Sequence, residues 1–348
     1  MKLLCICDGY INRESLPELR QLEKLGCDVE YYDNPLLFSL EKTMECMNAT
    51  EKKGAEGYPV PEELLRLVKG VDIIVVHMTP ISEALIRAAD NLRLVAVMRG
   101  GCDNVDVKRL SDKNIKIIHA AWRSSNSVAD ATVGMILAET RNIARSFASL
   151  KNNNSWRKNY PNTGNIHDLA TRTIGIIGFG YIGQRVAQRL KGFEAKILVH
   201  DPYISDETIE EQGYQPVTKE QLCREADIIT LHLRQSPATE GFIGKKELDM
   251  MKMTATLVNT ARARLVDEEA LVQALKDRKI QGAALDVFYE EPLPEKHPLL
   301  ALDNVTITSH IAGASGDTKI NSFTIIFDEL VRFFNGEDLK SLVKVPKN

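Results

Sequence analysis

An arginine, a glutamate and a histidine follow three apolar runs in the C-terminal half of the chain. Arg262 comes after TLVN, Glu291 after GAAL and His310 after VTIT. A guanidinium can hold a carboxylate through two parallel hydrogen bonds, and an imidazole can give or take a proton near neutral pH. A carboxylate beside the imidazole stabilises its charged form. These side chains suit hydride transfer between a nicotinamide cofactor and a 2-oxo acid, because the carbonyl oxygen must be protonated as it is reduced.

A second group of residues predicts how that cofactor is bound. Gly178, Gly180 and Gly183 have GxGxxG spacing after the apolar run 173–177, and Asp201 ends the next apolar run. The glycines permit a tight turn, a close approach of the pyrophosphate and close helix packing, in that order. Asp201 is placed to accept hydrogen bonds from the adenosine ribose, and its charge repels a 2′-phosphate. We therefore expect NAD rather than NADP.

Several motifs in fixed order resemble one family of enzymes. The segments VADATVGMILAETRNIAR, VNTARARLVDEEAL, GAALDVFYEEP and SHIAGAS, with the nucleotide unit, resemble the NAD-dependent D-isomer-specific 2-hydroxyacid dehydrogenases, which include phosphoglycerate, glycerate and D-lactate dehydrogenases. The resemblance implies that Arg262 binds substrate, that His310 donates and accepts the proton, and that Glu291, rather than its neighbour Glu290, is the acid partner. It also implies that Asp286 binds the nicotinamide carboxamide.

The expected binding residues lie in loops that follow strands. For the cofactor they are Gly178, Gly180, Tyr181, Ile182, Gly183, Asp201, Pro202, His232, Thr260, Ala261, Asp286, His310, Ala312 and Gly313. For the substrate they are Arg99, Gly100, Gly101 and Arg123. The loop RGGCDNVD is shorter than the family's RxGxGxDNVD form, and Arg234 stands where the family commonly has proline. Arg99, Arg123 and Arg264 favour an acid with a second anionic or polyhydroxylated end, such as a sugar acid or its phosphate. Salt bridges between these arginines and nearby acids are the other interpretation.

Apolar runs alternate with helical patterns along the whole chain, which predicts an α/β protein with parallel sheets. We expect two doubly wound domains, with a Rossmann NAD-binding domain (122–315) inserted into a flavodoxin-like substrate domain (1–121 and 316–348). A single long helix is predicted over 127–150, and an extra helix and loop over 34–60. The helical pattern 317–335 has an apolar face, and we expect it to pack on residues before about 120.

The composition limits the classes of partner that we expect for this protein. A net charge of −4 gives no general attraction to nucleic acid or anionic membranes, and no apolar run has the length of a membrane span. Six cysteines without CxxC spacing predict neither zinc nor disulfides, which favours the cytoplasm. We expect a homodimer. The alternative is an NAD(H)-sensing binding protein like the family's corepressors; the short segment after the last helical pattern favours an enzyme without a serine-regulated module.

Overall fold

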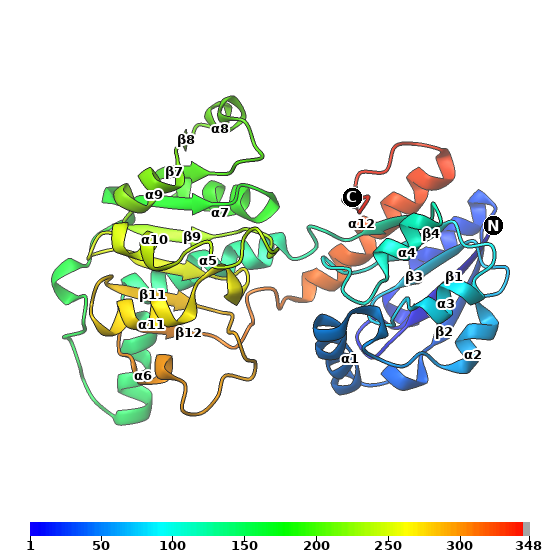
Figure 1. Ribbon diagram of the computed structural model, residues 1–348, viewed down its shortest axis with the longest axis horizontal. Helices are drawn as coiled ribbons and strands as arrows, with labels where there is room; N and C mark the ends of the chain where they lie inside the picture. Colours follow the sequence, from blue (N-terminus) through cyan, green and yellow to red (C-terminus); the bar gives the residue numbers. More distant parts are fainter. Residues whose placement is uncertain (344–348) are drawn as a thin grey trace. The chain divides into compact units, whose positions relative to one another are not determined.

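The chain forms two compact units, shown as ribbons in Figure 1. The computed structural model describes residues 1–343. The first unit consists of Met1–Ser124 and the C-terminal segment from Ser315, and the second is the continuous segment Ser125–Ala314. Each unit has its own parallel sheet, so the prediction of an α/β fold with two doubly wound sheets is confirmed.

The first unit contains a five-stranded sheet in the order β2-β1-β3-β4-β5. Its strands are β1 (Lys2–Cys7), β2 (Asp28–Asp33), β3 (Ile73–Val76), β4 (Leu94–Val97) and β5 (Lys116–His119). All neighbouring pairs are parallel, and this order is the flavodoxin-like one. The strand order reverses between β1 and β3, which makes that point the topological switch of the sheet.

Side chains alternate between the two faces of this sheet, and each face is covered. Its helices are the 3-10 helix η2 (Pro17–Leu25), α1 (Leu40–Lys53), α2 (Glu62–Leu67), α3 (Glu83–Ala88), α4 (Val107–Asp112) and α12 (Gly316–Asn335). Leu3 and Val75 pack with η2 and α12, whereas Leu4 and Ile74 pack with α2, α3 and α4. The C-terminal helix α12 therefore completes the core begun by β1, as its apolar face predicts.

The second unit contains a seven-stranded sheet in the order β12-β11-β10-β9-β6-β7-β8. Its strands are β6 (Thr173–Ile177), β7 (Lys196–His200), β8 (Gln215–Pro216), β9 (Ile228–Leu231), β10 (Thr256–Asn259), β11 (Gly282–Leu285) and β12 (Val305–Ile307). The strands are parallel throughout. The central part has the Rossmann order, and its switch point lies between β6 and β9.

Helices cover both faces of the second sheet. They are α5 (Ser125–Thr140), α6 (Ile143–Asn153), α7 (Tyr181–Lys191), α8 (Asp206–Glu211), α9 (Lys219–Glu225), α10 (Lys245–Met250) and α11 (Glu268–Lys276). Helices α5 and α7 share one core with α8, whereas α9, α10 and α11 share the core on the other face. This arrangement leaves the carboxyl ends of the strands open to loops, where ligands of such sheets bind.

The structure differs from the expectations in one helical segment. The expected long helix over 127–150 is wrong, because α5 ends at Thr140 and α6 begins at Ile143. Asn142 has a left-handed φ of 57° at this break, a conformation that asparagine tolerates better than most residues. The segment Pro17–Leu25 is a 3-10 helix. Within the described residues, no helix combines the length and the apolar character that crossing a membrane requires.

Candidate active site

The glycine loop between β6 and α7 has the shape that a dinucleotide pyrophosphate needs. Gly178 has a φ of 91°, and a Cβ there would lie 2.7 Å from the carbonyl carbon of His232. A Cβ on Gly183 would overlap the carbonyl oxygen of Gly178, so only glycine lets α7 pack this closely. A Cβ on Gly180 would meet nothing within 4 Å, so that side of the loop is open. No side chain caps α7 and its first turn has no acid, so its N-terminus suits an anion.

Asp201 follows β7 and contacts the same loop. Its Oδ2 accepts a hydrogen bond from the Phe179 N–H at 2.7 Å, and its Oδ1 accepts one from the Tyr203 N–H at 2.8 Å. A carboxylate oxygen has two acceptor positions, so each oxygen can still accept a ribose hydroxyl. Asp201 thus fits the adenosine end of NAD while holding the glycine loop in place. The glycine loop and Asp201 together fit the cofactor that the sequence predicts.

His232 supports this loop from the neighbouring strand. Its backbone carbonyl lies against Gly178, and its Nε2 lies 3.0 Å from Thr230 Oγ1. Burial lowers the pKa of His232 to about 3, so the ring is neutral. Its Nδ1 is shielded from solvent and has no hydrogen-bond partner among the described residues. A buried polar atom of this kind indicates a missing partner, which a bound cofactor could supply.

Glu291 and His310 form a direct pair at the carboxyl end of the sheet. Glu291 Oε2 lies 2.7 Å from His310 Nδ1, and Glu291 Oε1 accepts a hydrogen bond from the Phe288 N–H at 3.0 Å. Both side chains keep access to solvent, with exposed fractions of 37% and 47%. Because Nδ1 is engaged by the carboxylate, Nε2 is the ring nitrogen left to exchange a proton with a ligand.

The backbone of the His310 loop is strained and firmly held. His310 has a φ of 55°, a conformation that is rare for residues other than glycine. Asp286, which is buried after β11, accepts hydrogen bonds from Thr308 Oγ1 at 2.5 Å, from the Ile311 N–H at 2.9 Å and from the Ala312 N–H at 2.8 Å. The resemblance implies only a contact with the cofactor for Asp286, which stays a prediction. The structure adds that Asp286 fixes the loop that carries the histidine.

Arg262 follows β10, the strand next to β11. Its Nη1 donates to the carbonyl oxygen of Ala261 at 2.7 Å, and the side chain is otherwise exposed. Asn259 shapes this loop, because its Oδ1 accepts from the Ala261 N–H and its Nδ2 donates to the Arg262 carbonyl. Across residues 1–343 the Arg262 side chain contacts the Ala261 carbonyl and forms no ion pair. Its guanidinium therefore remains available to a carboxylate ligand.

The other expected cofactor residues lie around the same loops. Tyr181 and Pro202 are exposed, and Ile182 packs beside the α7 core. Thr260 is buried, and its hydroxyl lies 2.7 Å from Thr132 Oγ1 of α5, so it also ties β10 to that helix. Ala312 is buried and Gly313 follows it in the turn before α12.

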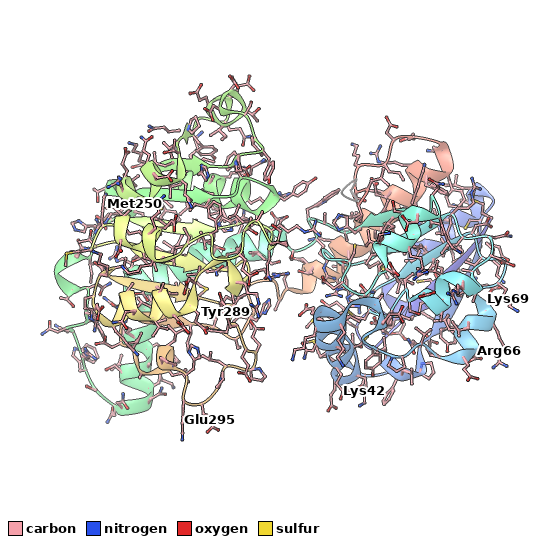
Figure 2. The ribbon with its side chains drawn as sticks, viewed as in Figure 1. Lys42, Arg66, Lys69, Met250, Tyr289 and Glu295 are labelled. Carbon is pink, nitrogen blue, oxygen red and sulfur yellow. The ribbon has the colours of Figure 1, made fainter. Side chains whose placement is uncertain are left out.

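Arg264, an arginine near the predicted site, forms a salt bridge with a nearby acid. Its Nη1 lies 3.1 Å from Glu240 Oε1, and its guanidinium lies over the ring of Tyr289, which Figure 2 labels. Both members of the ion pair are exposed by about half. Arg264 is therefore committed to a salt bridge and an aromatic contact in the described structure.

The expected substrate residues Arg99, Gly100, Gly101 and Arg123 lie in the first unit. Gly100 presents its carbonyl oxygen to His119 Nδ1 at 2.9 Å, and Gly101 packs against the side chain of Asp103. Arg99 is almost fully buried after β4. The short RGGCDNVD loop therefore places its arginine inward.

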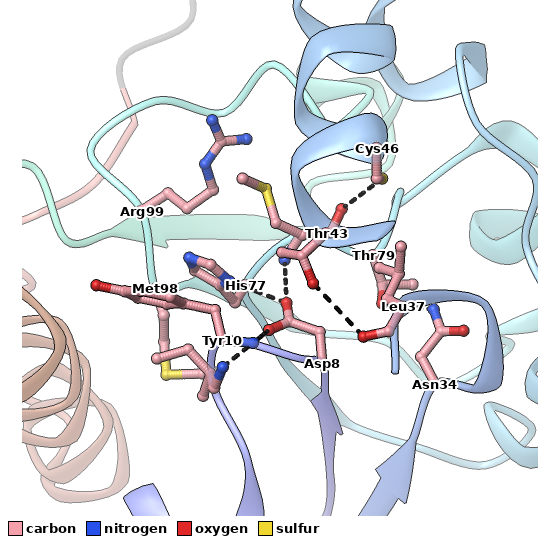
Figure 3. A network of polar contacts seen from close by, with 12 residues as sticks. Asp8, Tyr10, Asn34, Leu37, Thr43, Cys46, His77, Thr79, Met98 and Arg99 are labelled. Atoms are coloured by element: carbon pink, nitrogen blue, oxygen red, sulfur yellow. Dashed lines mark hydrogen bonds and ion pairs between the residues drawn. The ribbon is translucent and has the colours of Figure 1, made fainter. Parts of the chain in front are cut away.

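Sequence reasoning did not find three residues that organise these sites, which are Asn259, Asp8 and His77. The hydrogen bonds of Asn259 set the Arg262 loop. Asp286, predicted only as a cofactor contact, also holds the His310 loop. Asp8 and His77, a buried pair in the first unit that Figure 3 shows, lie 69 residues apart. Their positions directly after strands were the only signal that could have found them.

Comparison with known proteins identifies the family. Residues 133–312 match the family described as D-isomer specific 2-hydroxyacid dehydrogenase, NAD binding domain. The chain is 40% identical over 287 residues to a D-3-phosphoglycerate dehydrogenase of Methanocaldococcus jannaschii, which covers 82% of this chain and 54% of that protein. It is 36% identical to a hydroxypyruvate reductase of Thermotoga maritima, covering 80% of this chain and 90% of that one.

A solved structure agrees with the sequence matches. The D-lactate dehydrogenase of Aquifex aeolicus, solved with NAD and lactic acid, aligns with a TM-score of 0.70 at 26% identity, covering 97% of this chain and 96% of that one. The chain spans about half the length of phosphoglycerate dehydrogenases that it matches, among them that of Methanocaldococcus jannaschii. It belongs to the D-isomer-specific 2-hydroxyacid dehydrogenase family, and its second unit is the NAD-binding domain of that family.

Proposed function

We propose that the chain is an NAD-dependent oxidoreductase that interconverts a 2-oxo acid and a D-2-hydroxy acid. The single observation that carries the proposal is the Glu291–His310 pair, at 2.7 Å, in the loops that follow β11 and β12. Arg262 follows β10, the neighbour of β11 in the sheet. The same unit contains the glycine loop and Asp201, which fit the dinucleotide. Family membership supports both the cofactor and the class of reaction.

Each side chain of the site has a defined task in this reaction. The bound nicotinamide supplies or accepts the hydride. Arg262 holds the substrate carboxylate through its planar guanidinium. His310 donates a proton from Nε2 to the carbonyl oxygen during reduction, and takes it back in the reverse direction. Glu291 orients the ring through Nδ1 and stabilises the imidazolium, because the negative carboxylate lies beside the positive charge.

The proposal is tested by replacing His310 with glutamine in the full chain. The substitution removes the proton donor and leaves the glycine loop intact. Turnover of a 2-oxo acid, followed by NADH absorbance, is expected to fall by about 10²- to 10⁴-fold. The affinity for NADH, measured by fluorescence titration, is expected to fall far less than turnover, because His310 is not part of the pyrophosphate loop.

Two outcomes of that experiment contradict the proposal in different ways. Unchanged turnover in the glutamine variant would remove His310 from the mechanism. Tight NADH binding by the wild-type chain without turnover of any 2-oxo acid would instead favour an NAD(H)-sensing binding protein. A matched control is His297→Gln, because His297 caps a short helix at Pro298–Ala301 and lies outside the proposed site.

The substrate is proposed to carry a second anionic or polyhydroxylated end. The support is the presence of Arg99 and Arg123 in the first unit, at the carboxyl ends of its strands. A screen of 2-oxo acids with NADH tests this class directly. A preference for pyruvate or another small apolar acid would contradict it.

We further propose that the chain is a cytoplasmic homodimer. Helix α6 presents Ile143, Phe147 and Leu150 at helical spacing, with exposed fractions of 56%, 63% and 42%, and Trp156 beyond the helix is 79% exposed. Apolar side chains so exposed on one helix face are typical of a surface covered by another protein. The six cysteines are free thiols, which is common in a reducing compartment.

A further inference from the structure

A hollow of about 610 Å³ lies at the amino-terminal edge of the second unit's sheet. Thr254, Gln281 and Asp303 line it and lie one or two residues before the starts of β10, β11 and β12. Arg157 and Tyr160, in the segment that follows α6, line it as well. Pockets of roughly 300–1,000 Å³ commonly bind small molecules. The size of the hollow therefore suits a ligand of its own.

The hollow is separate from the residues that fit NAD and the proposed substrate. All its lining residues belong to the second unit. Asp201, Arg262 and His310 follow the carboxyl ends of strands in the same sheet, whereas the hollow borders the amino ends. Each residue of a parallel strand advances by about 3.3 Å, so the length of β10 separates the two edges by about 13 Å. A ligand in the hollow therefore leaves the dinucleotide site free.

Several hydrogen-bond donors that line the hollow have no protein acceptor. Arg157 donates from Nε to the Asn159 carbonyl at 2.6 Å, and its two Nη groups have no partner within residues 1–343. Gln281 accepts at Oε1 from Asn165 Nδ2, and its Nε2 has no partner in that range either. Donors without acceptors favour a ligand that brings acceptor oxygens.

The charges of the lining residues also favour an anion. Two arginines line the hollow together with one acid, Asp303. Arg278 Nη2 lies 2.5 Å from Asp303 Oδ1, so these two charges compensate each other. Arg157 forms no ion pair with any described residue, which leaves one positive charge uncompensated in the hollow. A carboxylate or phosphate matches a guanidinium because it accepts two parallel N–H donors.

Tyr160 and Met253 give the hollow an apolar surface. The Arg157 guanidinium carbon lies 5.0 Å from the centre of the Tyr160 ring, and Tyr160 donates its hydroxyl to the Arg157 carbonyl at 3.0 Å. These contacts order Arg157 before any ligand binds, which lowers the entropic cost of binding. Met253 is 72% exposed, and a thioether packs well on aromatic rings. A flat ring therefore finds apolar partners in the same hollow as the unpaired guanidinium.

We propose that this hollow binds a small flat anion, an aromatic or heteroaromatic ring with one carboxylate or phosphate group. Arg157 binds the acidic group through its Nη donors, and Tyr160 and Met253 contact the ring. Carboxylate and phosphate present the same kind of oxygen acceptor, so experiment distinguishes the two. The site is built by the second unit alone, and the binding claim does not depend on the proposed function.

The test is titration calorimetry of benzoate and of AMP into the full chain saturated with NADH. Because NADH fills the adenosine site, heat from AMP reports a second site. Acetate and inorganic phosphate are the counterparts that carry the same acidic groups without a ring. Each ringed probe is expected to bind about 10- to 100-fold more tightly than its counterpart, because burial of an aromatic ring contributes a gain of that size.

Variants of two lining residues test the proposed contacts. Arg157→Gln is expected to weaken binding of both ringed probes by about 10- to 100-fold, through the loss of a charged hydrogen bond. Arg157→Lys keeps the charge but loses the paired donors, so it is expected to fall between wild type and Arg157→Gln. Tyr160→Leu is expected to weaken binding by about 2- to 10-fold because the aromatic contact is lost. Tyr160→Phe keeps the ring and is expected to bind more tightly than Tyr160→Leu.

Two control variants separate the hollow from other positive charges of the same unit. Arg224→Gln removes an exposed arginine of α9, and Arg262→Gln removes the arginine proposed to hold the substrate carboxylate. Both are expected to bind the probes as wild type does. Melting curves by circular dichroism accompany each variant. If Arg157→Gln does not fold, Arg157→Lys and Tyr160→Leu decide the question.

Each outcome supports or overturns the proposal. Tighter binding of benzoate than of AMP assigns a carboxylate ligand, and the reverse assigns a phosphate ligand; either supports the site. No binding by wild type, equal affinity for the ring-free counterparts, unchanged affinity in Arg157→Gln, or lost binding in Arg262→Gln would overturn it. Binding only by Phe147→Glu, which is designed to separate the proposed dimer, would show that a second copy covers the hollow and would also overturn it. Absence of turnover with every 2-oxo acid would refute the proposed function alone.

Discussion

The Asp286→Asn substitution would test how His310, the proposed proton donor, is held. It replaces one carboxylate oxygen with an NH₂ group and keeps the size of the side chain. In the native structure, both oxygens accept from backbone N–H groups: Oδ1 from Ile311 and Oδ2 from Ala312. Whichever way the asparagine is turned, one of these N–H groups then faces another donor. The hydroxyl of Thr308 can rotate to adapt, but a backbone N–H cannot.

The size of the expected effect follows from the one backbone N–H that loses its acceptor. A buried N–H that loses its acceptor destabilises the local structure by about 1–3 kcal/mol. Hydrogen exchange of a peptide covering residues 308–314, followed by mass spectrometry, is therefore expected to speed up by about 5- to 150-fold. Turnover is expected to fall by about 10- to 100-fold, because a displacement of the histidine by about 1 Å is enough for such a loss.

Asp168→Asn is the matched control. Asp168 is in the same unit, its side chain is 84% exposed, and it loses only a surface ion pair with Arg141. Exchange in the 308–314 peptide is expected to be unchanged. Wild-type exchange and turnover in Asp286→Asn would refute the idea that Asp286 fixes the His310 loop.

Three further predictions concern the second unit. Gly183→Ala is expected to lower the melting temperature, since its Cβ would overlap the Gly178 carbonyl oxygen, whereas a Cβ on Gly180 meets no protein atom within 4 Å and Gly180→Ala is expected to leave the melting temperature unchanged. Equal shifts in the two variants would contradict the packing argument. Phe147→Glu is expected to shift sedimentation from dimer to monomer, and an unchanged dimer would place the interface elsewhere. The pKa of His232 is about 3 in the folded protein and near 6.5 in the unfolded chain. As the pH falls below about 6.5, the unfolded chain therefore takes up a proton that the folded protein does not. The free energy of unfolding then decreases as the pH falls. His232→Gln is expected to flatten that decline in melting temperature, and an unaltered slope would exclude His232 as its source.

Much of the fold is predictable because its signals are local. Most strands of the two sheets are short apolar runs, and the glycine spacing at 178–183 indicates a turn whose backbone requires that residue type. Local patterns do not reveal the break between α5 and α6, because the apolar periodicity continues through it. Buried Glu139 binds Arg145 there at 2.6 Å, and Arg145 also donates to Asn142 Oδ1. Tertiary contacts outweigh helix propensity at this position.

In the candidate sites, too, the positions of the residues were predictable from local patterns, whereas their tertiary contacts were not. Arg262, Glu291 and His310 could be found because each follows a strand, and sheet geometry then places those strand ends on one edge. The contacts that fix these residues could not be found, since they depend on side-chain direction and on partners distant in sequence. Asp8 and His77 illustrate this limit, because neither has a local pattern that marks it as part of a buried pair.

The division of the first unit between both ends of the chain has a consequence for synthesis on the ribosome. Strands β1 to β5 emerge early, but one face of their sheet packs on α12, whose Phe323, Ile326 and Leu330 are made only after the entire second unit. The second unit is continuous and can complete its core first. Until α12 is synthesised, one apolar face of the N-terminal sheet stays uncovered. This segment is therefore the part of the nascent chain most exposed to aggregation and to chaperone binding.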